Sequence, residues 1–260
     1  MQYKAIFSDM DGTLLNSQHQ ISLRTEQAIK SILRKGIPFI PVSARPPYAI
    51  TPYTDQLQTK LPIICYSGAL ILDQDLNELY SVTIEQTDLD KLTELLKPYE
   101  HLSISYYSGV DWFVNDKNCY WAAQEAEISG LTAKDMPVNV KNVHKVLIMA
   151  EPVYIQELEK LLTNALPYLS IHPSKPEYLE INNKAATKAN AIRFMENYFQ
   201  IAADEIIAFG DNFNDLDMLE YAGLSVAMGN APDEIKQIAK EVTATNNEDG
   251  IALILEREFA

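Results

Sequence analysis

The most informative segment of the sequence is Phe7-Ser8-Asp9-Met10-Asp11-Gly12-Thr13, near the start of the chain. The apolar run at residues 3–7 predicts a buried strand, and Gly12 predicts the turn that closes the following loop. Ligands of parallel α/β sheets bind beyond the carboxyl ends of the strands. We therefore expect Asp9 at the mouth of this strand and Asp11 in the loop just after it.

Two carboxylates placed this close together repel each other. At ~4 Å and an effective dielectric constant of ~20 the repulsion costs roughly 4 kcal/mol, which favours a bound cation or a shared proton. The ordinary alternative is a surface turn, which Asp-x-Asp-Gly sequences often form. A calcium loop of the EF-hand type does not fit, because its glycine stands two positions later.

Length and composition restrict the class of protein. A chain of 260 residues suits two domains, or one domain with an insertion, and 47% hydrophobic with 22% charged residues is ordinary for a globular protein. A net charge of −15 with no Lys/Arg stripe argues against nucleic-acid binding. No apolar stretch approaches the ~20 residues that span a membrane. With no signal-peptide layout and two cysteines, we expect a cytoplasmic protein.

The apolar pattern predicts an α/β fold that is interrupted by an insertion. In the first part, strands alternate with helices, and the strands lie at residues 3–7, 37–42 and 61–65. From about Thr83 the pattern changes to half-polar strands typical of antiparallel pairing. The last part returns to alternating helices and strands. We therefore predict a core of residues 1–82 and 186–260 and an inserted domain of residues 83–185.

Polar side chains follow several of the predicted strands. Asp9 and Asp11 follow the first strand, and the remaining groups are Ser43 and Arg45, Lys188 at a helix start, and Asp211, Asn214 and Asp215. Because the carboxyl ends of parallel strands lie at one edge of a sheet, we expect these groups to meet. Any one of these residues could simply be a helix cap or a solvated surface residue. For all of them to be so, several independent coincidences would be needed.

The chemistry that such a set supports is phosphoryl transfer. Asp9 would attack phosphorus and form an aspartyl-phosphate, and Asp11 would protonate the leaving alcohol and later deprotonate the hydrolytic water. Magnesium prefers oxygen ligands, and Asp9, Asp211 and a backbone carbonyl near Asp11 would bind it.

The remaining groups would act on the phosphate or on their neighbours. Ser43 and Lys188 would bind the phosphate oxygens and the charge that develops on them. Asn214 and Asp215 would orient Lys188 or metal-bound water.

These residues resemble the motifs of a known family. Asp9-Met10-Asp11-Gly12-Thr13, Ser43-x-Arg45, Lys188 and Gly210-Asp211-x-x-Asn214-Asp215 are similar in order and spacing to the four motifs of the haloacid dehalogenase superfamily. The run at residues 246–251 resembles the C-terminal signature of its Cof-type branch. The resemblance implies a Rossmann-like core with a parallel sheet and an inserted α+β cap of the Cof type (a C2 cap). It also implies a magnesium-dependent phosphatase that acts on small phosphorylated metabolites, such as sugar phosphates or phosphorylated cofactors.

The resemblance assigns roles to particular positions. The catalytic residues would be Asp9, Asp11, Ser43 and Lys188. The metal would be bound by Asp9, Asp11 and Asp211. The substrate would be bound by Gly12, Ser43, Ala44, Arg45 and Lys188. Three departures concern the substrate side: Ser43-Ala44-Arg45 replaces the usual Thr-Gly-Arg, Ser67-Gly68-Ala69 the usual Asn-Gly-Ala, and Ala189 a frequent glycine.

Other functions of related chemistry are distinguished by single features. Dehalogenases lack the second loop carboxylate, so Asp11 favours a phosphatase. A phosphomutase uses the same aspartyl-phosphate and stays open. From a different class, a phospho-Asp signalling receiver needs no inserted cap, and a non-catalytic metabolite binder would be expected to lose Asp11 first. We expect a small phosphorylated metabolite as partner, a monomer or homodimer, and no nucleic-acid or membrane partner.

Overall fold

The computed structural model describes residues 2–260, which form two compact units. The first unit contains the chain up to Ala44, Ile50–Tyr80 and Thr187–Ala260. The second contains Arg45–Ala49 and Ser81–Ala186. Across residues 2–260, no helix combines the length and the apolar character that crossing a membrane would require.

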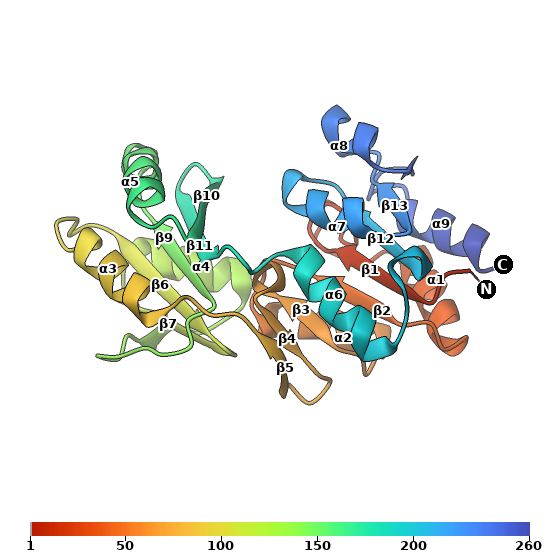
Figure 1. The fold of residues 1–260 in the computed structure, drawn as a ribbon, viewed down its shortest axis with the longest axis horizontal. Coiled ribbons are helices and arrows are strands. Elements are labelled where there is room, and N and C mark those ends of the chain that lie inside the picture. Colours follow the sequence, from red (N-terminus) through yellow and green to blue (C-terminus); the bar gives the residue numbers. More distant parts are fainter. Residues whose placement is uncertain (1) are drawn as a thin grey trace. The chain divides into compact units, whose positions relative to one another are not determined.

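The first unit is built on a sheet of eight strands within the described residues, in the order β14-β13-β12-β1-β2-β3-β4-β5. Their bounds are β1 Ala5–Asp9, β2 Phe39–Val42, β3 Ile63–Cys65, β4 Leu70–Leu72, β5 Glu78–Ser81, β12 Ile206–Gly210, β13 Leu224–Ala227 and β14 Glu241–Val242. Neighbours from β14 to β3 run parallel, and β4 is antiparallel to β3. Figure 1 shows β1, from the start of the chain, beside β12, from its last third.

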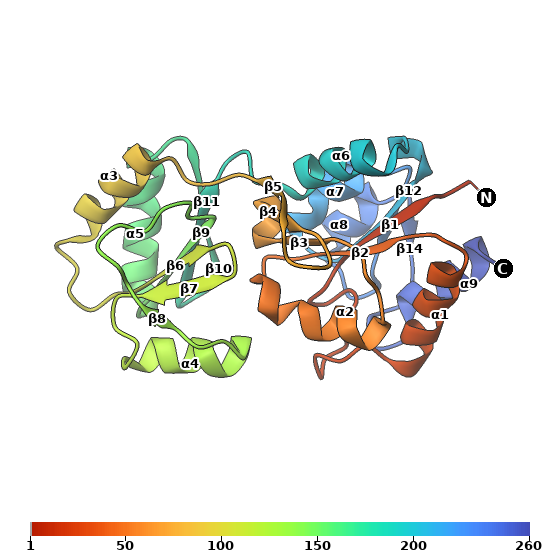
Figure 2. The ribbon, with the colours of Figure 1, turned by 90° about the horizontal axis from the view of Figure 1, so that it is seen from below.

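Helices cover both faces of this sheet (Figure 2). Apolar side chains of α6, α7 and α8 pack in one core cluster with the face that carries Phe7, while α1 contacts α2 and α9. The bounds are α1 Leu23–Arg34, α2 Thr51–Leu57, α6 Lys188–Phe199, α7 Leu216–Tyr221, α8 Asp233–Ile238 and α9 Gly250–Glu258. Short 3-10 helices add η2 Tyr66–Gly68, η3 Ala203–Glu205 and η4 Phe213–Asp215, and η1 Pro47–Ala49 belongs to the second unit.

Strand β1 lies in the middle of the parallel part of the sheet, and all five of its residues are buried. Continuous apolar strands are typical of parallel sheets that are covered on both faces. The predicted strand at 37–42 contains Pro41, which cannot donate to a ladder. The ladder between β2 and β3 begins only at Val42, where Ser43 N–H donates to the Ile64 carbonyl, so Pro41 removes no bond of that ladder.

The second unit contains a six-stranded sheet in the described residues, in the order β10-β11-β9-β6-β7-β8. The bounds are β6 Ser103–Ser108, β7 Asp111–Val114, β8 Lys134–Asp135, β9 Lys145–Met149, β10 Leu169–Lys175 and β11 Tyr178–Asn183. All pairs are antiparallel except β7 with β8. The helices are α3 Gln86–Leu96, α4 Tyr120–Ser129 and α5 Pro152–Ala165.

The two faces of this second sheet differ in chemistry, because neighbouring residues of a strand point to opposite sides. Tyr106 belongs to the apolar cluster beneath α3 and α5. Tyr107, the next residue, donates its hydroxyl to Glu125 of α4 at 3.1 Å. Figure 2 shows α3 and α4 on opposite sides of the sheet. The α4 side is therefore the polar face of the unit.

The predicted fold class, α/β with a parallel sheet, is confirmed. Several boundaries differ from prediction. The helix predicted over 117–129 begins at Tyr120, where Cys119 Sγ accepts the Ala122 N–H as a cap. The helix predicted from about Pro47 starts as a 3-10 turn and becomes α-helical at Thr51.

Candidate active site

Asp9 ends the central strand β1 and is only 6% exposed. Its Oδ1 lies 2.5 Å from the Lys188 Nζ, a distance typical of a charge-assisted hydrogen bond. Burial raises the pKa of Asp9 well above its usual range, the Lys188 charge opposes that rise, and Asp215 adds to it. The short contact with an ammonium group indicates an ionised pair.

Lys188 is the first residue of α6 and is almost completely buried. Thr187 caps the helix, because its Oγ1 accepts the Asn190 N–H at 3.1 Å. The Lys188 Nζ donates to Oδ1 of Asp215 at 2.6 Å as well as to Asp9. Burial alone would lower the pKa of Lys188, but the two carboxylates outweigh burial and raise it, so the side chain is charged.

Asp215 is fixed by the loop that follows β12. Its Oδ2 accepts the N–H groups of Asp211 at 2.9 Å and Asn212 at 3.0 Å. A Cβ atom at Gly210 would lie 2.6 Å from the Asp215 Cβ, so this approach requires glycine. Since both oxygens of Asp215 accept bonds, its geometry suits orienting Lys188.

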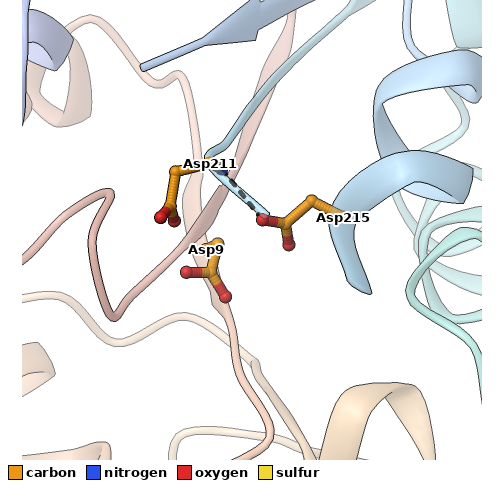
Figure 3. Close-up of side chains that lie close together, drawn as sticks. All are labelled: Asp9, Asp211 and Asp215. Carbon is orange, nitrogen blue, oxygen red and sulfur yellow. Dashed lines mark hydrogen bonds between the residues drawn. The ribbon is translucent and has the colours of Figure 1, made fainter. Parts of the chain in front are cut away.

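Asp211 lies beside Asp9 and shares its loop with Asp215 (Figure 3). Its Oδ1 accepts the Thr13 hydroxyl at 2.7 Å. Burial raises the pKa of Asp211 to about 6, and the Thr13 hydrogen bond opposes that rise. The Gly12 backbone, with φ +84°, lies so close that a Cβ there would be 2.4 Å from Asp211 Oδ2.

The three carboxylates of Asp9, Asp211 and Asp215 each place an oxygen within 4.8 Å of the others. At that separation each pair of charges repels by roughly 3–4 kcal/mol for an effective dielectric constant of ~20. Lys188 supplies one positive charge against three negative ones. Carboxylate oxygens with a surplus of negative charge are the donor set that Mg²⁺ prefers, so the residues present fit a divalent cation.

The structure brings Asp9, Lys188, Asp211 and Asp215 together, and it places Asp11 differently. The Asp11 side chain is 48% exposed, and its Oδ1 lies 3.5 Å from His19 Nδ1. It is not a member of the carboxylate cluster, although its charge contributes to raising the pKa of Asp211. Asn214 is also exposed and lies in η4.

The residues after β2 are divided between the two units. Ser43 is 2% exposed, and its backbone is bound on both sides, by the Ile64 carbonyl and by the Ser67 N–H, at 2.9 Å each. Ala44 is half-buried and ends the first segment of the first unit. Arg45 begins the short segment that belongs to the second unit and donates to the Ala49 carbonyl at 3.4 Å.

Two residues near the carboxylates were not predicted. The sequence pattern assigns no role to Thr13 beyond its place in a motif, whereas its hydroxyl donates a hydrogen bond to Asp211. Asn230 follows β13 and donates to the Gly12 carbonyl at 2.8 Å. The rule that strand ends share one edge of a parallel sheet could have found Asn230, because β13 is parallel to β12.

The carboxylate of Asp9, bound by a buried lysine and flanked by a second carboxylate, lies at the edge of a parallel sheet where α/β proteins bind their ligands. The family model for haloacid dehalogenase-like hydrolases matches residues 6–255. The chain belongs to this family, which confirms the resemblance expected from the motifs.

Relatives of known sequence and structure are similar over the whole chain. A Haemophilus influenzae protein named "Putative phosphatase" is 49% identical over 260 residues, covering 100% of this chain and 99% of the relative. The 5-amino-6-(5-phospho-D-ribitylamino)uracil phosphatase YitU of Bacillus subtilis is 29% identical, covering 97% of this chain and 96% of that protein. A haloacid dehalogenase-like hydrolase from Bacteroides thetaiotaomicron superposes with a TM-score of 0.91 at 30% identity, over 99% of this chain and 100% of that one.

Proposed function

We propose that the protein is a magnesium-dependent phosphatase that hydrolyses phosphate monoesters of small metabolites through an aspartyl-phosphate on Asp9. The observation that carries the proposal is the position of the Asp9 carboxylate, at the mouth of β1 between Lys188 and Asp211. A carboxylate nucleophile in a buried site needs a cation beside it to bring a phosphate dianion near. Lys188 is that fixed cation.

The reaction has two steps. In the first, an oxygen of Asp9 forms a bond to phosphorus while the bond from phosphorus to the substrate alcohol breaks, and Asp11 gives its proton to the departing oxygen. In the second, water attacks phosphorus, Asp11 takes a proton from that water, and the bond to Asp9 breaks to release inorganic phosphate. Asp11 reaches these positions by leaving His19, which its half-exposed side chain permits.

The other residues bind the phosphate and the metal. Ser43 and Lys188 bind the phosphate oxygens, with Gly12, Ala44 and Arg45 contributing to the substrate site. The metal ligands are Asp9, Asp211 and Asp11, the last through its backbone carbonyl. Mg²⁺, when bound, offsets the repulsion between the carboxylates and the phosphate. Asp215 holds Lys188 in place through the bond at 2.6 Å, and Asn214 is the proposed partner for metal-bound water.

We assign residues 83–185 the role of a cap that selects the substrate. The substrate class is a small phosphorylated metabolite, a sugar phosphate or a phosphorylated cofactor or its precursor. The name of the Bacillus subtilis relative, a phosphatase of a phosphorylated ribitylaminouracil, supports this class. We expect the enzyme in the cytoplasm, as a monomer or homodimer.

The test is phosphate release from a panel of phosphorylated sugars and cofactors, with Mg²⁺ and with excess chelator. Asp9→Asn should lower the rate by at least about 10³-fold, because it removes the nucleophile. The control is Asp233→Asn, which changes an aspartate whose side chain is 88% exposed and should leave the rate unchanged.

Appreciable turnover by Asp9→Asn would disprove the nucleophile. No release from any compound, while Asp9 still becomes phosphorylated by a small phosphodonor, would instead favour a phosphomutase or a signalling protein.

A further inference from the structure

The turn after β3 has an unusual backbone. Tyr66, Ser67 and Gly68 have φ values of 51°, 57° and 100°, the one run of three consecutive left-handed residues among residues 2–260. Left-handed backbone is costly for residues with a side chain, and it persists only where the surroundings hold it. Tyr66 is completely buried, and β3 and β4 anchor the turn on both sides.

One side of this left-handed turn (Tyr66, Ser67, Gly68) holds the backbone of Ser43. The Ser67 N–H donates to the Ser43 carbonyl at 2.9 Å, and the Ser43 N–H donates to the Ile64 carbonyl at 2.9 Å. The backbone of Ser43 is therefore hydrogen-bonded both to the strand before the turn and to the turn itself.

The other side of the turn lies against the start of α6. A Cβ atom at Gly68 would be 2.2 Å from the Thr187 carbonyl oxygen and 3.2 Å from the Lys188 nitrogen. Ordinary contacts of a Cβ begin at 3.4 Å. Any side chain at position 68 therefore requires α6 or the turn to move by about 1 Å, because these neighbours are backbone atoms that cannot rotate away.

We propose that the left-handed turn is a positioning element that sets the relative placement of Ser43 and Lys188, the two residues assigned to the phosphate. This proposal rests on the proposed function. Lys188 has two short contacts, 2.5 Å to Asp9 and 2.6 Å to Asp215, and a shift of the helix start breaks both. A glycine is required at position 68 because only its bare backbone lets α6 begin close enough to β1.

The test compares Gly68→Ala with Gly36→Ala. Gly36 also has a left-handed φ, +80°, but an added Cβ there would meet nothing within 4 Å. The two variants thus impose a similar backbone penalty, and only Gly68→Ala adds the collision. We expect Gly68→Ala to lower kcat/KM by about 100-fold, as a displacement of about 1 Å at a reacting group does, and Gly36→Ala to change it by less than about twofold.

A readout beyond activity separates positioning from loss of structure. Inhibition by inorganic phosphate should weaken at least about tenfold in a Gly68→Ala protein that still unfolds cooperatively in urea. Unchanged phosphate inhibition in a folded Gly68→Ala protein would overturn the proposal. An inactive wild-type protein would disprove the proposed function instead.

A milder variant covers the case in which Gly68→Ala does not fold. Thr187→Ala removes only the hydroxyl that caps α6, which costs about 0.5–2 kcal/mol and leaves most of the stability of a domain in place. Loosening the helix start should weaken phosphate inhibition about threefold or more. Unchanged phosphate inhibition in Thr187→Ala would overturn the proposal in that case.

Discussion

Each unit of the molecule buries a lysine among carboxylates, and the two arrangements differ in charge balance. In the second unit, Lys145 lies 2.8 Å from Glu180, and both side chains are largely buried. In the first unit, Lys188 bonds Asp9 and Asp215, with Asp211 nearby. Lys145 thus has one short carboxylate contact, while Lys188 stands in a cluster of three acids.

The pKa values of the acids follow this difference. Burial would raise the pKa of Glu180, but Lys145 outweighs burial and the pKa is lowered. Burial and neighbouring acids raise the pKa of Asp9 despite Lys188. Within residues 2–260, Asp9, Asp211 and Asp215 form the only group of three potential metal ligands this close together. Lys145 also interacts electrostatically with Glu125, whose pKa burial raises while the lysine opposes that rise. The Lys188 cluster has one positive charge against three carboxylates, and this surplus of negative charge favours a divalent cation.

The largest expected effect comes from replacing each buried lysine by methionine, which tests the difference in charge balance directly. Removing one partner of a buried ion pair costs about 3–5 kcal/mol, so both Lys145→Met and Lys188→Met should lower the free energy of unfolding by that amount in excess chelator. Mg²⁺ should recover part of the loss in Lys188→Met, because the cation replaces the missing charge. In Lys145→Met it should add only the wild-type increment.

Urea denaturation with and without Mg²⁺ measures both free energies. Equal recovery of the two variants by Mg²⁺ would contradict the difference in charge balance. The double variant Lys145→Met/Glu180→Leu is the matched control for charge burial, since it removes both charges and should recover much of the stability.

Magnesium itself should stabilise the wild-type protein. At a concentration 100 times its Kd, a ligand that binds only the folded state adds about 2.7 kcal/mol to the free energy of unfolding. Asp211→Asn should abolish most of this increment, because it removes a proposed ligand, and Glu180→Gln should leave it intact. A Mg²⁺ titration followed by thermal unfolding checks both variants. An increment that survives in Asp211→Asn would remove this residue from the metal site.

The last prediction concerns the pH dependence of the second unit. Gly109 N–H donates to His144 Nδ1 at 3.1 Å, so Nε2 carries the hydrogen and donates to Ser81 Oγ at 3.0 Å. Burial lowers the pKa of His144 to about 4 from its usual 6.5. Between these values the unfolded chain binds a proton that the folded chain does not, so stability falls as the pH falls from 6.5 to 4.

The slope should reach about 1.4 kcal/mol per pH unit for this one proton. His144→Gln should remove that slope from the urea-denaturation profile. An identical slope in His144→Gln would show that His144 is not the titrating group.

Much of the candidate site could be predicted, because one rule places it. The carboxyl ends of parallel strands share an edge, and this rule brought Asp9, Ser43, Lys188 and Asp211 to the same edge of the predicted sheet. The rule says nothing about where a loop side chain turns. Asp11 was therefore expected near the metal, whereas the structure places its side chain half-exposed beside His19.

Other features depend on contacts that no local pattern encodes. The left-handed φ values of Tyr66 and Ser67 contradict the usual preference of such residues, and tertiary contacts such as the bond from Ser67 N–H to the Ser43 carbonyl accompany them. The grouping of Arg45–Ala49 with the second unit likewise follows from tertiary contacts. The sequence showed Ser67-Gly68-Ala69 as a departure from a family motif without indicating its backbone.

The pairing of β1 with β12 also has a consequence for synthesis on the ribosome. Ala5 pairs with Ile206, and almost the whole second unit, Ser81–Ala186, is made between them as one continuous segment. The nascent chain therefore holds an unpaired edge of β1 until β12 emerges, while the second unit already has all of its strands. Lys188, Asp211 and Asp215 are all made after the second unit, so the cluster around Asp9 can form only once that unit has been synthesised, while β13, β14 and α9 follow still later.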